Sequence, residues 1–537
     1  MVHADSTRPV SARLSRRLGG MLLFALLLLF FAYPLLRFLG LPFWSTPLVA
    51  SGGESWLNGL LVAVRNTVLL ALAAAVLVAP LGAGLAWLLE RRGSMLNHAI
   101  GAALWLIFLA PSYLLTTGWQ IVFREPWLRH GLAASLFYSP LGIVALLAFK
   151  ALPFAVFVVR PTWAGMGREL EEAMRVHALS APRRLWLTAR LALPAIAAGF
   201  VIAFIESVQE FGIPATLGAH LRLPILTYAI YERLSTSPLD FAGAARLSWV
   251  LVALAAGGAL LHLGLHHRHS AVLVHGRARR AAPPAPTHGT RGLMLAAAGL
   301  LWVLGLLVPG AALVVSAAHG GDWAGDYRSL INSTGFAVLA ASASLMLALT
   351  LARSANRPGN RLAIGIELFT LSNMAIPGLV LGAAYLMAFN NAWLPLYGTS
   401  VLLILGYTAG YTPMLTRLLQ SPVAQIDRRL GEAARLHGLS WAARVIDIEA
   451  VLLAAPLVRG WLLAFGFVLF ELPVSELLYP PGRTPLGVAI VRLNQTLEFH
   501  AAARLALSGL ALTTAVVALA GVVTYLLLPI GARRSHA

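Results

Sequence analysis

Apolar runs of about 20 residues recur along the whole chain, separated by short polar segments. A helix needs about 20 apolar residues to cross a bilayer. Helices also satisfy their own backbone groups there, and these runs are too long for barrel strands. The pattern predicts twelve transmembrane helices, at 19–40, 64–89, 98–118, 139–160, 191–214, 241–265, 292–317, 333–353, 363–389, 399–418, 451–475 and 502–530. We therefore expect an all-α integral membrane protein.

The composition agrees, because 59% of the 537 residues are hydrophobic and only 11% are charged. Soluble domains carry roughly a quarter charged residues, so this chain cannot cover a surface that faces water. With no cysteine, it can form neither disulfides nor thiolate metal sites. The apolar run near the N-terminus is too long for a signal peptide, so we expect it to be a retained first span.

The net charge of +19 reflects topology more than an acidic partner. With twelve spans, the main basic segments fall on one side of the membrane: Arg8–Arg17, Arg91–Arg92, Arg268–Arg291, Arg353–Arg361 and Arg533–Arg534. The positive-inside rule makes that side cytoplasmic, with both termini inside. The basic excess thus orients the chain, and we expect no nucleic-acid partner.

Much of the sequence is an internal repeat, in which matching residues lie about 260 positions apart. Pro153 matches Pro413, Glu210 matches Glu471, and Phe241-x-x-Ala-Ala-Arg-Leu matches the same pattern at Phe499. We predict a first repeat of six helices over 1–265, a basic, proline-rich cytoplasmic linker over 266–291, and a second six-helix repeat over 292–537. An even number of spans in each repeat makes the repeats parallel, related by a pseudo-twofold axis along the membrane normal.

A polar phrase of nine residues also occurs twice, as EAMRVHALS at 172–180 and EAARLHGLS at 432–440, with six of nine positions identical. Its residues favour helix, and its Glu and Arg lie three apart, on one helix face. Gly438 can end such a helix, and Ser180 and Ser440 can cap the next one. We expect a short helix, a turn and a second helix, in two equivalent cytoplasmic positions that suit a twofold-symmetric partner.

The segment Glu432-Ala433-Ala434-x3-Gly438 resembles the EAA loop of ABC importer permeases, which forms the helix that docks on the ATPase subunit. Two departures are that Met174 replaces the second alanine and Ala178 the glycine in the first copy. The resemblance implies a type I ABC importer permease fold with coupling loops near 168–190 and 428–450. It assigns ATPase coupling to Glu172, Ala173, Arg175, Ala178, Glu432, Ala433, Ala434, Arg435 and Gly438.

The resemblance also implies the partners, namely two copies of an ABC ATPase subunit and a periplasmic substrate-binding protein at a bacterial inner membrane. The chain has no Gly-x4-Gly-Lys-Ser/Thr phosphate-binding loop, so we expect it to be no enzyme and to bind no cofactor. ATP and Mg²⁺ belong on the ATPase. The fused arrangement and the segments Phe211–Gly218 and Glu471–Gly482 resemble the ferric-iron permeases. Thiamine and aminoethylphosphonate permeases are the alternatives.

Charged residues inside predicted spans mark a candidate translocation path. Glu206, Glu210 and Glu471 lie near the ends of the fifth and eleventh spans, and Lys150 lies in the fourth. Intramembrane charges usually face a cavity or a partner, and ferric iron prefers oxygen ligands. Glu210 and Glu471, being repeat-related, are expected to face each other. The structural alternative is that the glutamates form ion pairs or accept helix-end hydrogen bonds and that Lys150 is a counter-charge. No metal site is assigned.

Two other functional classes are compatible with parts of the pattern. A secondary transporter driven by an ion gradient also uses twelve spans in two repeats, but it leaves the repeated polar phrase unexplained. A membrane scaffold needs no repeated carboxylates. We therefore predict the permease subunit of an ATP-driven importer, with ferric iron as the best cargo.

Overall fold

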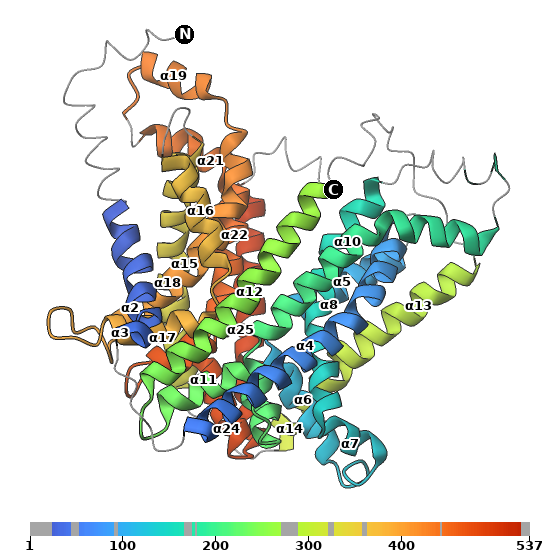
Figure 1. Ribbon diagram of the computed structural model, residues 1–537. Helices are drawn as coiled ribbons and strands as arrows, with labels where there is room; N and C mark the ends of the chain where they lie inside the picture. The colour runs from blue at the N-terminus through green and yellow to red at the C-terminus, as the bar shows by residue number, and fades with distance from the viewer. Residues whose placement is uncertain are drawn as a thin grey trace.

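The computed structural model describes residues 24–44, 53–90, 95–165, 174, 176–177, 180–269, 288–319, 327–356, 362–440 and 443–527. All regular elements of this part are helical (Figure 1). The first half contains η1 (Leu28–Ala32), α2 (Tyr33–Leu39), α3 (Leu41–Trp44), α4 (Gly53–Leu89), α5 (Met95–Leu109), α6 (Ser112–Arg124), α7 (Leu132–Phe137), α8 (Pro140–Gly165), α10 (Ala181–Gln209), η2 (Pro214–Gly218), α11 (Leu226–Ser235) and α12 (Phe241–His269), where η denotes a π-helical turn.

The second half repeats this order. It contains α13 (His288–Trp302), η3 (Val303–Leu307), α14 (Val308–His319), α15 (Arg328–Ala355), α16 (Leu362–Met374), α17 (Gly378–Ala388), α18 (Ser400–Ala424), α19 (Arg428–Leu436), η4 (Arg444–Glu449), α21 (Ala450–Leu452), α22 (Ala454–Leu469), α23 (Pro473–Leu478), α24 (Leu486–Gln495) and α25 (Phe499–Leu527). Helices α12 and α13 extend into both ends of the predicted linker 266–291, whose residues 270–287 lie outside the described part.

The number of twelve transmembrane helices is not confirmed. Among the described residues, seven helices are long and apolar enough to span a membrane, or nine if each of two bent helix pairs is one span. The pair α5–α6 bends by 101° and the pair that leads into α22 by 75°. Pro111 and Pro377 each precede a helix in extended conformation, because proline cannot continue a helix hydrogen-bond ladder. Hydropathy alone does not reveal such breaks.

The two halves share one packing plan. In the first half α4, α8 and α10 pack on one another, and in the second α15, α18 and α22 do the same. The Thr67 hydroxyl accepts the Leu226 N–H at the start of α11 at 2.8 Å, and Ser333 accepts the Leu486 N–H at the start of α24 at 2.7 Å. The same cap at repeat-related places supports the duplication that the sequence predicts.

The first helices of each half are exchanged. The segment η1–α2 packs against α17 of the second half, whereas α13 and α14 pack against α5 and α6 of the first. Pro34 and Pro309 lack the N–H that would serve a carbonyl one turn earlier. Ring donors from the opposite half serve such carbonyls instead: the Tyr385 hydroxyl donates to Phe30 O, and the Trp119 indole donates to Leu304 O at 3.2 Å.

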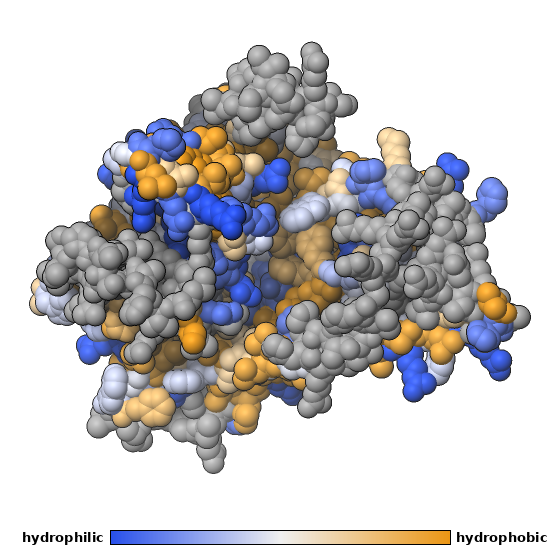
Figure 2. All heavy atoms as spheres, turned by 90° about the horizontal axis from the view of Figure 1, so that it is seen from above, coloured by the Kyte–Doolittle hydropathy of each residue, from blue (hydrophilic) through white to orange (hydrophobic). Residues whose placement is uncertain are grey.

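The helices converge at the end of the molecule that carries α24 and splay toward the end that carries α19 (Figure 1). We call these the α24 end and the α19 end. Seen from the α19 end, the surface is hollowed between two groups of helices, and apolar residues line much of the visible floor (Figure 2). The largest apolar core contains residues of both halves, such as Val208 and Leu477. The halves are therefore joined mainly near the α24 end.

Candidate coupling helix and translocation path

The second copy of the polar phrase forms α19, a short helix with a cap at each end. Asp427 accepts the Arg429 N–H at 2.9 Å, as an N-cap carboxylate does. At the other end Gly438 has φ +76°, its N–H bonds to Arg435 O at 3.0 Å, and the Leu439 N–H bonds to Ala434 O at 3.0 Å. These paired bonds around a left-handed glycine are a Schellman motif. The predicted helix stop at Gly438 is confirmed.

A second cap follows this turn. The Ser440 hydroxyl accepts the Ala443 N–H at 3.1 Å, as predicted for the start of the next helix. In the first half Ser180 also holds the N-cap position of α10, but its hydroxyl makes no capping hydrogen bond. The first copy of the phrase is otherwise largely outside the described residues, and so are its predicted coupling residues Glu172, Ala173, Arg175 and Ala178.

The surface of α19 is open. Glu432, Ala433, Arg435 and Gly438 are exposed, and the Leu436 side chain is 90% exposed, whereas Ala434 is buried at 6%. Glu432 and Arg435 make no ion pair, although their spacing suggested one. An exposed pair of this kind contributes little energy in water, which explains why its spacing alone does not bring it together. The helix thus offers both charges and an apolar side chain outward.

A bent segment connects α19 to the membrane helices. The turns η4 and α21 lead into α22 through the 75° bend. Glu449 of η4 pairs with Arg353 at the end of α15, with 2.5 Å between the charged atoms. This ion pair fixes the segment to the helix bundle. The segment that follows α19 along the chain is thus in contact with α15 and continuous with α22.

Glu210 and Glu471 are related by the repeat. Both follow the C-terminal end of a helix, Glu210 that of α10 and Glu471 that of α22. Glu210 accepts the Ser112 hydroxyl at 2.5 Å and the Gly212 N–H at 2.8 Å. Glu471, which is buried, accepts the Val474 and Ser475 N–H groups at 2.8 and 2.9 Å. Both carboxylates thus satisfy N–H groups where a helix ends and a short helical segment follows. This is the structural alternative set out for them from the sequence.

The beginning of α6 contacts both of these segments. Ser112 bonds to Glu210, and the hydroxyl of the next residue, Tyr113, donates to Phe470 O at 3.1 Å in the other half. The two glutamate segments therefore lie on either side of one helix start. Sequence reasoning did not identify Tyr113, since a lone tyrosine in an apolar run is unremarkable.

Lys150 holds the break between α5 and α6. Its ammonium group donates to Ile107 O at 3.3 Å, Phe108 O at 2.9 Å and Ala110 O at 2.7 Å. These carbonyls belong to the end of α5, where helical partners are lost. A lysine has three N–H donors, so all of them are in use. Lys150 acts here as a helix-end cap, and it interacts electrostatically with Glu206 and Glu210.

Glu206 differs from the other charged residues of the predicted path. It is partly exposed on α10, and its carboxylate has no hydrogen bond or ion pair among the described residues. It lies four residues before Glu210, on the same face of the helix. Glu206 is thus the one carboxylate of the predicted path with neither oxygen in a hydrogen bond among the described residues, whereas Glu210 accepts its bonds on Oε1 and Glu471 uses both oxygens.

A reciprocal clasp closes the α24 end. The short helix α11 of the first half reaches the second, where the Tyr231 hydroxyl donates to Glu476 at 3.4 Å. In the other direction α24 reaches the first half, where the Gln495 amide donates to Ala215 O at 2.9 Å. Ala215 and Glu476 occupy corresponding places in the repeat, so each half holds the other by the same element.

One side of the clasp is a buried polar network. The Asn494 amide donates to Thr117 Oγ1 at 2.9 Å and to Gln120 Oε1 at 2.7 Å, across the two halves. Exposure of these three side chains is 3% or less. No prediction from the sequence named this network; the only signal was a row of polar residues, Ser112, Thr116, Thr117 and Gln120, within the apolar α5–α6 segment.

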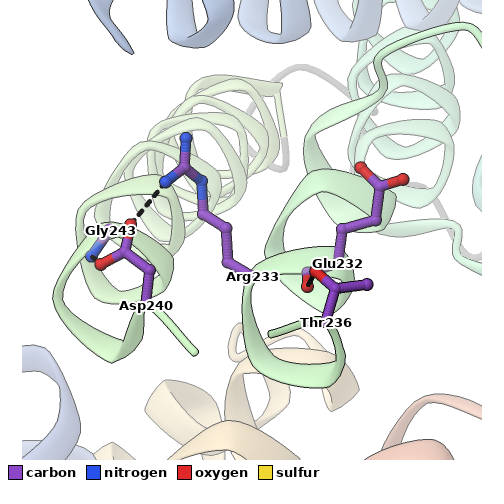
Figure 3. A network of polar contacts seen from close by, with 5 residues as sticks. All are labelled: Glu232, Arg233, Thr236, Asp240 and Gly243. Carbon is purple, nitrogen blue, oxygen red and sulfur yellow. Dashed lines mark hydrogen bonds and ion pairs between the residues drawn. The ribbon is translucent and has the colours of Figure 1, made fainter. Parts of the chain in front are cut away.

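The turn between α11 and α12 is fixed by charge (Figure 3). Arg233 pairs with Asp240 at 2.5 Å, and Asp240 also accepts the Gly243 N–H at 2.7 Å. A Cβ at Gly243 would lie 1.9 Å from the Asp240 carboxylate, so a larger residue there would displace this side chain from its pair with Arg233. Glu232 points away from this pair (Figure 3). The ion pair anchors the arm that α11 extends over the second half.

Comparison with known proteins identifies this architecture. Residues 78–318 and 344–535 match the family described as binding-protein-dependent transport system inner membrane component. The chain belongs to this family. Its two matches in one polypeptide make it a fused, two-repeat permease, and the first match runs across the predicted linker. The division at 265 and 292 itself stays a prediction.

Several curated proteins are similar to the chain. The ferric transport system permease FbpB 1 of Haemophilus influenzae is 24% identical over 326 residues, which cover 57% of this chain and 51% of that protein. FbpB 2 of the same organism is 24% identical over 458 residues, or 83% of this chain and 86% of that protein. A sulfate transport system permease, cysT of Prototheca wickerhamii, is 25% identical over 194 residues, or 35% of this chain and 76% of that protein.

The chain thus spans about half the length of the first of these relatives. No solved structure gives a significant match to it. The family supplies the inner membrane component of transport systems, which accounts for the apolar helices.

Proposed function

We propose that this chain is the membrane subunit of an ATP-driven ABC importer at a bacterial inner membrane, and that its cargo is ferric iron delivered by a periplasmic binding protein. Two ATPase subunits, which carry ATP and Mg²⁺, bind the loops around Glu172 and Glu432. The α19 end then faces the cytoplasm. The observation that carries the proposal is α19, a capped helix whose outward surface has no partner within the described part of the chain.

The chemistry of α19 suits a protein groove. Leu436 offers an apolar side chain that is 90% exposed, beside the charged Glu432 and Arg435. A short amphipathic helix of this kind docks by inserting its apolar residue and pairing its charges. The Schellman turn at Gly438 gives the helix a defined end, so it can be moved as a rigid unit.

The route from α19 into the bundle supports a mechanical role. When ATP closes the two ATPase subunits, the docked loops approach each other. The Arg353–Glu449 pair and the bend before α22 carry this movement into α15 and α22. The halves then separate at the α24 end, cargo enters, and hydrolysis returns the chain to the splayed arrangement of Figure 1.

Charge in the path supports a cationic cargo over an oxyanion. The ammonium donors of Lys150 are all bound to carbonyls, so they are not available to an oxyanion such as sulfate. Glu206 instead presents free carboxylate oxygens, the ligands that a hard cation prefers. The ferric names of the FbpB relatives point the same way.

Variants of α19 with matched controls test the proposal. The chain would be purified with the ABC ATPase encoded beside it, and vanadate-sensitive ATP hydrolysis would be measured in liposomes with iron-loaded binding protein. Glu432→Lys reverses an exposed charge on α19, and Glu125→Lys makes the same change on an exposed residue after α6. We expect Glu432→Lys to lower stimulated hydrolysis at least about tenfold and Glu125→Lys to leave it unchanged.

A backbone variant tests the same helix independently. Gly438 and Gly482 both have positive φ, +76° and +74°, and a Cβ at either meets nothing within 4 Å. Alanine in this conformation costs about 1–2 kcal/mol at either site. Gly438→Ala should weaken coupling, whereas Gly482→Ala should not. Normal coupling in both α19 variants, or no association of the chain with any ATPase, contradicts the proposal and favours an ion-gradient transporter.

A further inference from the structure

The contacts that join the two halves at the α24 end differ in chemistry from one side to the other, although the halves are repeats. Helix α6 corresponds to α17, because Pro111 and Pro377 precede these helices in the same extended conformation. Helix α24 corresponds to α11, because a hydroxyl accepts the first N–H of each, at Leu486 and Leu226. Each contact across the halves can therefore be compared with its counterpart.

The contact of α24 with α6 is polar. The Asn494 amide donates to Thr117 Oγ1 at 2.9 Å and to Gln120 Oε1 at 2.7 Å. The next residue, Gln495, donates to Ala215 O at 2.9 Å. We call the contact formed by Thr117, Gln120 and Asn494 the polar seam. Each of its groups can form an equivalent hydrogen bond with water.

The corresponding contact of α11 with α17 is apolar. The residues that replace the members of the polar seam are Ala383 for Thr117, Leu386 for Gln120 and Leu234 for Asn494. Helix α11 packs against α17, and these three apolar side chains are at most 6% exposed and belong to one core. We call this contact the apolar seam. One polar contact lies beside it, from Tyr231 of α11 to Glu476 of α23 at 3.4 Å.

The difference extends along the buried face of α6. Four buried polar residues of α6 correspond to residues of α17 without a polar side chain: Ser112, Thr116, Thr117 and Gln120 correspond to Gly378, Gly382, Ala383 and Leu386. The small residues let α17 approach α23 closely, since a Cβ at Gly382 would lie 3.3 Å from atoms of Val474 and Leu477. Close apolar packing of this kind resists separation, because water does not replace the contacts that are lost.

The two seams therefore respond differently when water enters this end of the molecule. Opening of the polar seam exchanges hydrogen bonds between the halves for hydrogen bonds to water, so the net loss for each bond is small. Opening of the apolar seam exposes buried apolar side chains, and nothing offsets the loss of their burial. The polar seam is the easier of the two to open and to close again.

We propose that cargo enters through the polar seam, and that the apolar seam stays packed as a hinge when the α24 end opens. The proposal rests on the proposed function, in which this end faces the binding protein. Thr117, Gln120 and Asn494 then line the entrance, so the cargo meets neutral amide and hydroxyl groups there. Opening is one-sided, although the two halves are repeats.

Spin-label distances across each seam test the proposal. Because the chain has no cysteine, only introduced pairs at exposed sites carry labels: Glu125 with Thr496 across the polar seam, and Thr236 with Ala392 across the apolar seam. The complex with the ABC ATPase would be measured in nanodiscs, first at rest and then with ATP, vanadate and iron-loaded binding protein. We expect the polar-seam distance to lengthen by at least about 5 Å and the apolar-seam distance to change by less than about 2 Å. Equal lengthening of both distances, or lengthening of the apolar-seam distance alone, overturns the proposal.

A variant that copies the apolar seam tests the chemistry. Thr117→Ala, Gln120→Leu and Asn494→Leu together give the polar seam the residues of its counterpart. Because all the partners change at once, none of them is left buried without a partner, and we expect the chain to fold and to bind the ATPase. The polar-seam distance should no longer lengthen, and ferric uptake should fall at least about tenfold. The control, Thr370→Ala with Asn373→Leu, removes two polar groups whose bonds stay within α16 and should transport as the parent does. Parental uptake in the triple variant overturns the proposal.

The chain without ATPase separates this proposal from the proposed function. In nanodiscs the polar-seam distance distribution should narrow in the triple variant, and the apolar-seam distribution should stay as in the parent. If this holds while the parent complex couples no ATP hydrolysis, the proposed function fails and the assignment of the two seams stands. If the polar-seam distribution keeps its width in the triple variant, the assignment is overturned even when transport is driven by ATP.

Discussion

The buried network around Asn494 holds the two halves together at the α24 end, and Asn494→Leu is the sharpest way to weaken it. Leucine has the same branched arrangement of side-chain heavy atoms as asparagine, although its methyl groups are bulkier than the amide, so α24 keeps its place with a local adjustment of packing. The change removes two hydrogen bonds, to Thr117 at 2.9 Å and to Gln120 at 2.7 Å. It also leaves Gln120 Oε1, in a side chain only 2% exposed, without this donor.

The energy can be worked from these contacts. A buried hydrogen bond contributes about 1 kcal/mol net, and an acceptor left unsatisfied costs about 1–3 kcal/mol. Thr117 keeps its own donated bond to Tyr113 O at 2.7 Å, so only Gln120 loses its partner. Greater burial of apolar surface by leucine offsets part of the loss. A net weakening of about 2–3 kcal/mol shifts the ratio of closed to open α24 end roughly 30- to 150-fold.

Spin-label distances measure this shift directly. The chain has no cysteine, so cysteines introduced at exposed Leu132 and Trp393, one in each half, are labelled alone. Asn494→Leu should broaden or lengthen the distance between them and raise basal ATP hydrolysis several-fold. The control Asn373→Leu removes an amide whose bond, to Phe369 O at 2.9 Å, stays within its own helix. If the variant gives the same distance distribution as the parent, and hydrolysis within about twofold, the Asn494 network does not hold the two halves together.

Two further predictions follow from contacts between the halves. Trp119→Phe removes the indole N–H that donates to Leu304 O at 3.2 Å. The loss should lower the free energy of unfolding by about 1–2 kcal/mol, measured as a lower melting temperature. The control Trp393→Phe, at an exposed site, should leave the melting temperature unchanged. Burial raises the pKa of Glu476, in the clasp outside the spans, to about 7, against the opposing effects of Arg492 and the Tyr231 hydroxyl. Because an exposed carboxyl loses its proton more readily, the clasp should be strongest below about pH 4.5 and weaken as pH rises through 7. Basal hydrolysis should therefore increase between about pH 5 and 7 in the parent, with little further change above pH 7, and less so in Glu476→Gln; an equal slope in both would contradict the assignment.

Local sequence pattern was sufficient to predict α19 and its caps. Gly438 ends α19 and Ser440 caps the next helix as their residue types predict, because caps depend on a few neighbouring backbone groups. Glu432 and Arg435 lie three apart on α19 but make no ion pair, since spacing on a helix permits a contact without making it favourable in water. The coupling residues predicted in the first copy, Glu172, Ala173, Arg175 and Ala178, lie outside the described part of the chain and stay predictions.

For the predicted translocation path, the sequence revealed less than the tertiary structure did. Hydropathy located apolar helices but did not reveal the break at Pro111. The carbonyl groups just before this break accept hydrogen bonds from all three N–H donors of Lys150. Glu206, Glu210 and Glu471 looked alike in sequence, because a carboxylate in an apolar run carries no sign of its partner. Only the folded chain separates Glu206 from the two glutamates that cap helices.

The sequence by itself determined the membrane class, the duplication and the position of α19. These depend on composition, periodicity and local caps, which are properties of neighbouring residues. Tertiary structure alone decided the exchange of first helices, the clasp of α11 and α24, the Asn494 network and the freedom of Glu206. Each of these joins residues more than 150 positions apart or depends on which partners a side chain reaches, and no pattern within a single segment contains that information.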